Sequence, residues 1–163
     1  MSDILIMGSV TPGNLNNAAS YVLYHQFTAL YNASVYYISV YCLVDSNVRV
    51  AIYTNDSDKP KTLLVESAST AITKTGWRNI YFASPYPVVQ GTIYWLASNC
   101  QTNGGASYSG GSGLPRYCNQ SHAYGAFPAS ASGGTVYTIF NIAMGAYGML
   151  PTGAPVCFDM AVV

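Results

Sequence analysis

Residues 47–97 constrain the fold most, because they spell out successive β-strands and their turns in one continuous stretch. Apolar residues recur at every second position from 48 to 52, which is the period of a strand with one buried face. Turn-forming residues at 55–60 then reverse the chain into a hairpin. Breakers separate the β-rich segments that follow: Gly76, the Pro85-Tyr86-Pro87 turn and Gln90-Gly91. The stretch therefore predicts an antiparallel sheet.

The flanking residues extend this pattern. Segments 21–28 and 34–44 alternate in the same way, and 135–147 reads as a long final strand. No segment shows the three-and-four apolar spacing of a capped helix. We therefore predict an all-β fold, a two-sheet antiparallel β-sandwich of jelly-roll-like form with little or no helix. The residues expected to face between the sheets are Trp77, Trp95, Phe82, Phe140 and Ile52.

The chain length predicts one domain. At 163 residues, the chain can bury one good core but is short for two. We expect residues 1–163 to form a single sandwich domain with three special segments. These are an N-terminal arm or edge strand at 1–20, a long glycine-rich loop at 99–120 and a C-terminal strand at 155–163.

The composition limits the possible partners. Only 7% of the residues are charged, against about 25% in a typical soluble domain, and the chain contains 15 tyrosines. A surface with so little charge suits docking against other protein subunits or an extracellular setting. The Lys and Arg residues number 6 in total, too few to neutralise a run of phosphates, so no nucleic acid is expected.

The sequence also bears on the cellular location. No apolar window approaches the roughly 18 residues of a membrane-spanning helix. The first ten residues, MSDILIMGSV, have an acidic residue and a short apolar run, so we expect no secretory signal peptide. A virus structural protein made in the host cytoplasm would fit this pattern.

The four cysteines have no metal-ligand spacing. Cys100 and Cys118 bracket the glycine-rich stretch, and a disulfide there would stabilise the fold by about 3 kcal/mol in the chain-entropy model. Cys42 would then pair with Cys157 if the last strand returns beside it. The alternative is that all four are buried thiols that behave as small hydrophobes.

Two segments, VRVAIYTNDSDKPKTLLVES and GWRNIYFASPYPVVQGTIYWLA, carry a resemblance to a known family. They resemble the jelly-roll β-sandwich module, similar in shape to carbohydrate-binding modules, of phage, archaeal and bacterial surface and virion proteins. The resemblance covers the middle of the chain and implies the sandwich fold. It also implies a non-catalytic building block of tail fibres, capsid decorations or cell-surface stalks, since such modules occur widely in that role.

Candidate catalytic and metal-binding residues are few. The chain has 2 histidines, and neither His25 nor His122 lies near a nucleophile motif, so we expect no enzyme and no catalytic residue. No metal or other cofactor is expected, with one weak exception. Asn55, Asp56 and Asp58 place the oxygen ligands that calcium prefers in a single turn. The alternative is that these side chains only tighten the turn by bonding its backbone.

A candidate binding patch lies within 108–124. Exposed aromatic rings beside amide and charged groups are typical of sugar recognition, and tyrosine suits both sugar and protein interfaces. The patch consists of Tyr108, Arg116, Tyr117, Asn119, His122 and Tyr124. Its occupant is either a cell-surface glycan or another subunit, and the low surface charge favours a subunit.

Together, these observations lead to one hypothesis and two alternatives. The leading hypothesis is a non-catalytic virion protein, a capsid decoration or a tail or fibre component, which binds copies of itself or a major capsid or tail protein. The first alternative is an extracellular glycan-binding, lectin-like module at the cell surface. The second is an exported surface-filament subunit whose edge strands pair between copies.

Overall fold

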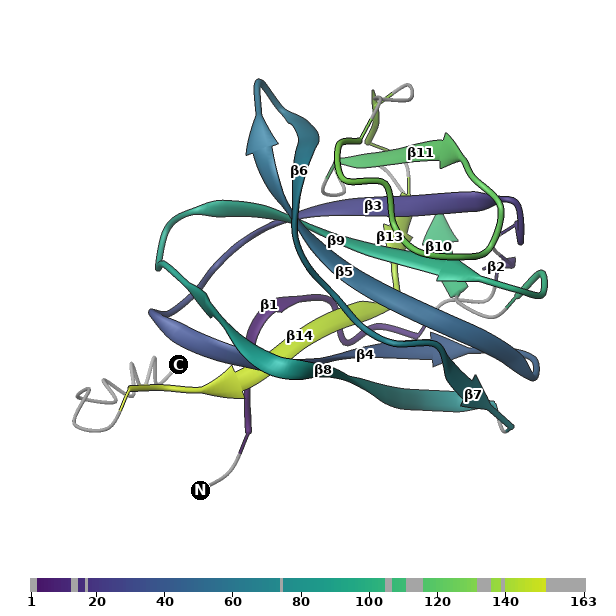
Figure 1. Ribbon diagram of the computed structural model, residues 1–163, viewed down its shortest axis with the longest axis horizontal. Coiled ribbons are helices and arrows are strands. Elements are labelled where there is room, and N and C mark those ends of the chain that lie inside the picture. Colours follow the sequence, from purple (N-terminus) through teal and green to yellow (C-terminus); the bar gives the residue numbers. More distant parts are fainter. Residues whose placement is uncertain are drawn as a thin grey trace, which may run out of the picture.

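Two antiparallel sheets form the two layers of the computed structural model (Figure 1). The structure describes residues 3–12, 15–16, 18–73, 75–104, 107–110, 116–131, 136–138 and 140–151, with the backbone alone at 15–16, 107–110 and 140–141. All regular elements in these ranges are strands. The predicted all-β, two-sheet antiparallel sandwich is therefore confirmed.

The strands divide between two main sheets and one small sheet. The four-stranded sheet has the order β1 (Ile4–Gly8), β14 (Met144–Met149), β4 (Ala33–Cys42) and β8 (Gly76–Val88). The seven-stranded sheet has the order β12 (Val136–Tyr137), β11 (Tyr117–Ser121), β3 (Tyr21–Thr28), β9 (Ile93–Cys100), β5 (Ser46–Asp56) and β6 (Lys59–Glu66), and β7 (Thr70–Ile72) also pairs with β5. The small sheet has the order β13 (Phe140–Ile142), β10 (Ser107–Gly110) and β2 (Leu15–Asn16).

The hairpin of β5 and β6 shows how local sequence sets the register. Its loop consists of Ser57 and Asp58, whose φ angles are 50° and 61°. Two consecutive positive φ angles match the twist of the flanking strands, and Asp tolerates this conformation better than most residues. The turn is therefore shorter than the predicted 55–60.

The main core fills the space between the two sheets. Alternate residues of each strand meet there, among them Ile38 and Val40 of β4 and Val50 and Ile52 of β5, all fully buried. Burying each such side chain contributes about 1.5–3 kcal/mol. Ile52 and Phe82 lie in this core as predicted.

A second core lies on the outer face of the seven-stranded sheet. The segment that follows β11, green in Figure 1, runs across this face and adds Phe127 and Ala131 to the cluster. Trp95 is fully buried there, so the prediction that it faces between the sheets was wrong. Tyr24 and Tyr53 are also fully buried in this second core, with ring centroids 5.2 Å apart.

Two other predictions need correction, and Figure 1 shows both regions. The predicted strand 135–147 is divided among β12, β13 and β14. The predicted loop 99–120 is only partly a loop, because it contains the end of β9, all of β10 and most of β11. The predicted C-terminal strand 155–163 lies outside the described residues.

Candidate functional site

The tip of the β5–β6 hairpin holds the three residues considered for calcium. Asn55 Oδ1 accepts hydrogen bonds from Trp95 Nε1 at 2.8 Å and from Gln26 Nε2 at 3.2 Å. Asp56 Oδ2 lies 3.7 Å from Lys61 Nζ. Protein donors therefore already engage the oxygens that calcium would need.

Asp58 links this hairpin to the predicted binding patch. Its Oδ2 lies 3.2 Å from Arg116 Nη2, and its Oδ1 accepts a hydrogen bond from Gln26 Nε2 at 3.4 Å. The backbone N–H of Gln26 also donates to the Arg116 carbonyl at 2.9 Å. The two candidate sites thus meet in one polar cluster.

The other patch residues make contacts within the chain. Tyr117 is buried against the main core, and Asn119 is half-buried on β11. His122 Nε2 donates to the Ala126 carbonyl at 2.9 Å, and the hydroxyls of Tyr124 and Ser69 lie 2.5 Å apart. The side chain of Tyr108 lies outside the described part of the structure.

The cysteines do not form the predicted disulfide. Cys42, Cys100 and Cys118 are all buried thiols. Cys100 belongs to the main core and Cys118 to the second core, so their side chains lie on opposite faces of the seven-stranded sheet. The β3 strand also separates the strands that carry them, so the predicted Cys100–Cys118 bond was wrong. The partner predicted for Cys42, Cys157, lies outside the described residues.

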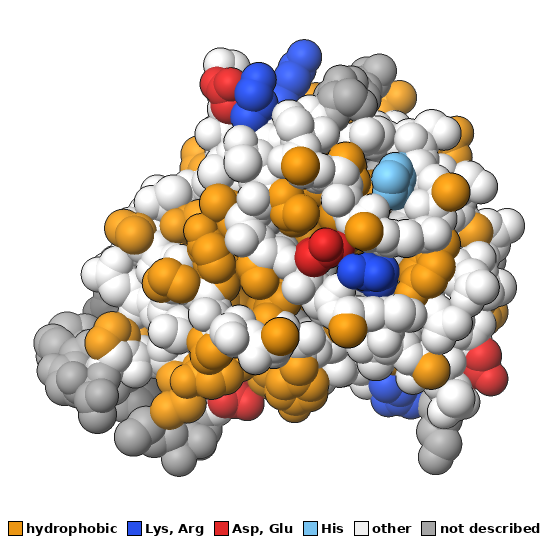
Figure 2. Space-filling model, in the orientation of Figure 1, with side chains coloured by type: hydrophobic (Ala, Val, Ile, Leu, Met, Phe, Trp, Pro, Cys, Tyr) orange, Lys and Arg blue, Asp and Glu red, His pale blue; other side chains and the backbone are white. Residues whose placement is uncertain are grey.

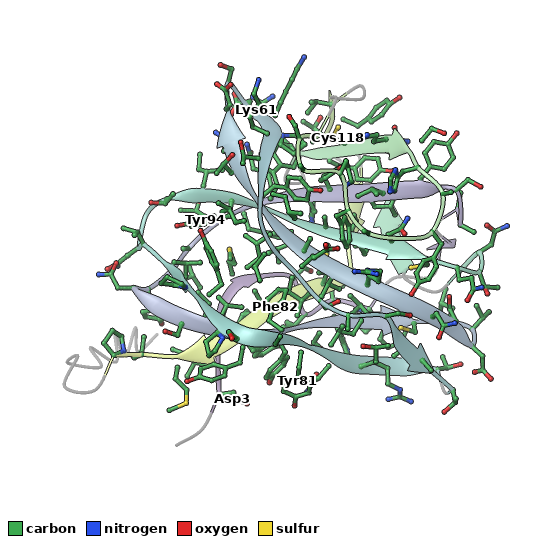
Figure 3. The ribbon with its side chains drawn as sticks, in the orientation of Figure 1. Asp3, Lys61, Tyr81, Phe82, Tyr94 and Cys118 are labelled. Atoms are coloured by element: carbon green, nitrogen blue, oxygen red, sulfur yellow. The ribbon has the colours of Figure 1, made fainter. Side chains whose placement is uncertain are left out.

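The outer face of the four-stranded sheet carries a surface that the sequence prediction missed, which we call the aromatic face. Tyr37 of β4 lies opposite Tyr147 of β14 and Tyr81 of β8, and these three residues form the tyrosine row. Figure 3 shows that Tyr81 points away from the core while its neighbour Phe82 points between the sheets. The Tyr37 ring stacks on Tyr147 with centroids 5.3 Å apart and contacts Tyr81 at 4.9 Å.

A strip of smaller residues lies beside the tyrosine row. Gly145, Ser39 and Asn79 are paired across the same three strands, and we call them the small-residue strip. Beyond it, Tyr41 faces Trp77 with ring centroids 5.5 Å apart. Trp77 therefore packs on the outer face, and the prediction that it lies in the core was wrong.

Exposure and hydrogen bonding distinguish the row from the strip. Tyr81 is 60% exposed, whereas Ser39 is 5% exposed and lies low between its neighbours. The side chains of Ser39 and Asn79 take no part in the hydrogen bonds found among the described residues. The surface thus offers the raised Tyr81 ring beside the exposed Asn79 side chain, whereas Tyr37 and Ser39 are buried lower on the sheet.

The hydroxyls of Tyr37 and Tyr147 on the aromatic face stay protonated far above neutral pH. Burial, and to a smaller extent the nearby Asp3 carboxylate, raise the pKa of Tyr37 to about 12. Burial also raises the pKa of Tyr147. These hydroxyls can therefore donate and accept hydrogen bonds at physiological pH.

Charged side chains are sparse over the molecule. In Figure 2 one group of charged side chains lies over the β5–β6 hairpin at the top, the others stand apart over the rest of this face, and apolar side chains are scattered widely. No group of three or more His, Cys, Asp or Glu placed to share a metal ion occurs among the residues described. The described part of the chain likewise has no helix of sufficient length and apolar character to span a bilayer.

The sequence did contain a signal for the aromatic face. The outward positions of β4 read Tyr37, Ser39, Tyr41, and those of β8 read Trp77, Asn79, Tyr81. Both series are aromatic, small and polar, aromatic at a two-residue period. The match becomes informative only once the register aligns the two strands.

Neither a protein-family model nor a curated protein sequence matches the chain.

Proposed function

We propose that this chain is a non-catalytic structural protein of a virion, a capsid decoration or a tail or fibre component, that binds copies of itself or other virion proteins. The observation that carries the proposal is the aromatic face, which leaves Tyr81 60% exposed on an open sheet face with little charge. Large exposed aromatic surfaces mark interaction sites in folded proteins. The protein would be made in the host cytoplasm and reach the outside within the particle.

The engagement of the acidic side chains supports a non-catalytic role. Glu66 Oε2 lies 3.0 Å from Arg49 Nη2 and accepts a hydrogen bond from the Phe127 N–H at 3.0 Å. Asp58 pairs with Arg116 in the cluster described above. These carboxylates hold segments of the chain together, whereas a general base needs an oxygen within reach of a substrate.

Fractionation of particles from the producing culture tests this proposal. We expect the chain to co-purify with particles at a fixed ratio to the major capsid or tail protein, as measured by quantitative mass spectrometry. A chain found only outside particles, and monomeric at every concentration in light scattering, would contradict the proposal.

A second candidate function is neutral saccharide binding by the same face. The small-residue strip favours it, because the exposed Asn79 side chain, which makes no hydrogen bond among the described residues, lies between Trp77 and Tyr81 along β8. No Lys or Arg belongs to either row, so an anionic polymer gains no ion pair there. Calorimetric titration with neutral oligosaccharides tests this candidate, which predicts saturable binding that is lost in Tyr81→Ser.

A further inference from the structure

We propose that Asn103 is a site of spontaneous covalent modification, in which its side-chain amide carbon closes on the backbone nitrogen of Gly104 and ammonia is lost. The site lies in the turn that follows β9, at one end of the sandwich. This chemistry needs no partner and is independent of the proposed assembly function.

The residue after Asn103 is a glycine. Among the asparagines of the sequence, Asn103 alone has this neighbour. Glycine carries no Cβ, so no side chain shields the Gly104 nitrogen from the Asn103 amide carbon. The two reacting groups also belong to one short stretch of chain, which removes most of the entropic cost of bringing them together. We therefore expect Asn103 to be the most reactive asparagine of the chain.

The fold leaves both reacting groups uncommitted to a strand. The Asn103 side chain is exposed, and neither residue belongs to a β-strand. Gly104 is buried, but its N–H makes no hydrogen bond among the described residues. Its φ angle of 86° is one that glycine adopts without strain. No strand ladder therefore holds the Gly104 nitrogen away from the amide carbon.

A backbone donor already points at the oxygen that becomes negatively charged in the reaction. The Ala19 N–H donates a hydrogen bond to Asn103 Oδ1 at 2.7 Å. When the Gly104 nitrogen attacks the amide carbon, the carbonyl electrons move onto Oδ1. A hydrogen bond to this oxygen stabilises the tetrahedral intermediate, so the Ala19 N–H acts as an oxyanion donor.

The reaction balances with water as its co-reactant. A bond forms between the Gly104 nitrogen and Asn103 Cγ, the Cγ–Nδ2 bond breaks, and the Gly104 proton leaves with the departing ammonia. Water then opens the resulting succinimide ring. Attack at Cγ gives aspartate with a normal backbone. Attack at the main-chain carbonyl carbon gives isoaspartate, in which the main chain runs through Cγ.

Isoaspartate would disturb the contacts of this turn. The Leu43 N–H donates to the Gly104 carbonyl at 3.0 Å, and the Thr102 N–H donates to Ser46 Oγ at 3.1 Å. These two bonds hold the turn against the connection between β4 and β5. The isoaspartyl linkage adds a main-chain atom between Thr102 and Gly104, so both bonds cannot keep their geometry. We expect the modification to loosen this end of the sandwich.

Ageing the folded chain at mildly alkaline pH tests the proposal, with peptide mass spectrometry to follow each asparagine. Asn32 is the matched control, because it is exposed and its Oδ1 accepts a hydrogen bond from the Gln90 N–H at 2.9 Å. The residue after it is Ala33 and not glycine. We expect Asn103 to convert at least about tenfold faster than Asn32. Conversion of Asn32 at the same rate, or an unmodified Asn103 after prolonged ageing, would overturn the proposal.

Two variants test the roles of the reacting groups. Asn103→Gln lengthens the side chain by a methylene group, so closure on the Gly104 nitrogen should be lost. Ala19→Pro removes the N–H donor and should slow the conversion of Asn103 at least about threefold. Ala18→Pro keeps the Ala19 N–H and is the matched control. Urea unfolding of both proline variants checks that the fold is retained, and equal rates in these two variants would exclude Ala19 as an oxyanion donor.

The structural consequence needs a separate measurement. The isoaspartyl chain, isolated by chromatography after ageing, should unfold at a lower urea concentration than Asn103→Asp. This variant carries the same charge on a normal backbone, so the comparison isolates the added main-chain atom. Equal urea midpoints would contradict the expected loosening of the turn.

Discussion

The outer faces of the two main sheets differ in one respect: the chain covers that of the seven-stranded sheet, whereas no segment within the described residues covers that of the four-stranded sheet. On the seven-stranded sheet, the segment after β11 brings Phe127 over Tyr24 and Tyr53, which are both fully buried. On the four-stranded sheet, Tyr37 is 7% exposed but its neighbour Tyr81 is 60% exposed. The same residue type thus serves as core on one sheet and as surface on the other. Burial depends here on a distant segment and not on the strand's own pattern.

The largest expected effect concerns the covering segment. Phe127→Ala removes the ring that packs edge-to-face on Tyr53 at a centroid distance of 6.3 Å. We expect the free energy of unfolding to fall by about 3–5 kcal/mol, as for other buried Phe truncations. Urea denaturation followed by circular dichroism measures it, with Tyr81→Ala as the matched truncation on the open face. Equal losses in the two variants would show that an aromatic ring contributes the same free energy of unfolding on the covered face as on the open face.

Alkaline pH tests the tyrosines on both faces. The pKa of Tyr37 rises from 10.0 to about 12 on folding, so the folded state holds this proton more tightly than the unfolded state does. The associated stability is complete below pH 10 and falls as the pH approaches 12, by on the order of 3 kcal/mol for this residue. Burial raises the pKa values of Tyr24 and Tyr53 as well, which adds to the loss. The urea concentration at the midpoint of unfolding should fall less steeply with pH in Tyr37→Phe than in the unmodified chain. An unchanged slope would exclude Tyr37 as a contributor to the loss of stability at alkaline pH.

A smaller effect is expected where Glu66 fastens the covering segment. Glu66→Gln removes the negative charge that pairs with Arg49. The same charge strengthens the hydrogen bond that the Phe127 N–H donates to Glu66, so this bond weakens in the variant. We expect a loss of about 1–2 kcal/mol in the free energy of unfolding. The control is Lys61→Met, because the Lys61–Asp56 pair is 57% exposed on both sides and should contribute under about 0.5 kcal/mol. A Glu66→Gln effect no larger than the control would mean that the ion pair does not hold the cover.

The smallest effect on folding is expected at the most exposed tyrosine. Tyr81→Ser should lower the free energy of unfolding by less than about 1 kcal/mol, because its ring makes its main contact with Tyr37 alone. Urea denaturation at a concentration where the chain is monomeric measures this value. A loss above 2 kcal/mol, on the order of a core truncation, would show that the aromatic face belongs to the folding core.

Local patterns in the sequence were sufficient for much of the fold. The predicted strand 21–28 is β3, because its alternation is intact and turn residues bound it. The Pro85-Tyr86-Pro87 segment was misread as a break, since β8 is an edge strand and one side of it needs no N–H donors. Proline is compatible with an edge strand, but the sequence alone does not show which strands lie at the edge of a sheet.

The candidate site was harder to predict, for a physical reason. Alternation shows that Trp95 and Leu96 face opposite sides of β9, but not which side the second sheet covers. That depends on the segment after β11, which has little regular periodicity of its own. For the same reason, the spacing of Cys100 and Cys118 suggested a bond that the opposite faces of the sheet forbid.

The placement of the two indole rings has a practical consequence. Trp95 is fully buried in the second core, and Trp77 is half-buried on the aromatic face, and the chain contains 2 tryptophans. The molecule therefore carries a separate fluorescent probe in each region. In a Trp77→Phe chain the emission reports on the covering segment, and in a Trp95→Phe chain it reports on the open side. A dissolved quencher should reduce the fluorescence of the Trp95→Phe chain more strongly, because this chain keeps the half-buried Trp77. The measurement needs no attached dye.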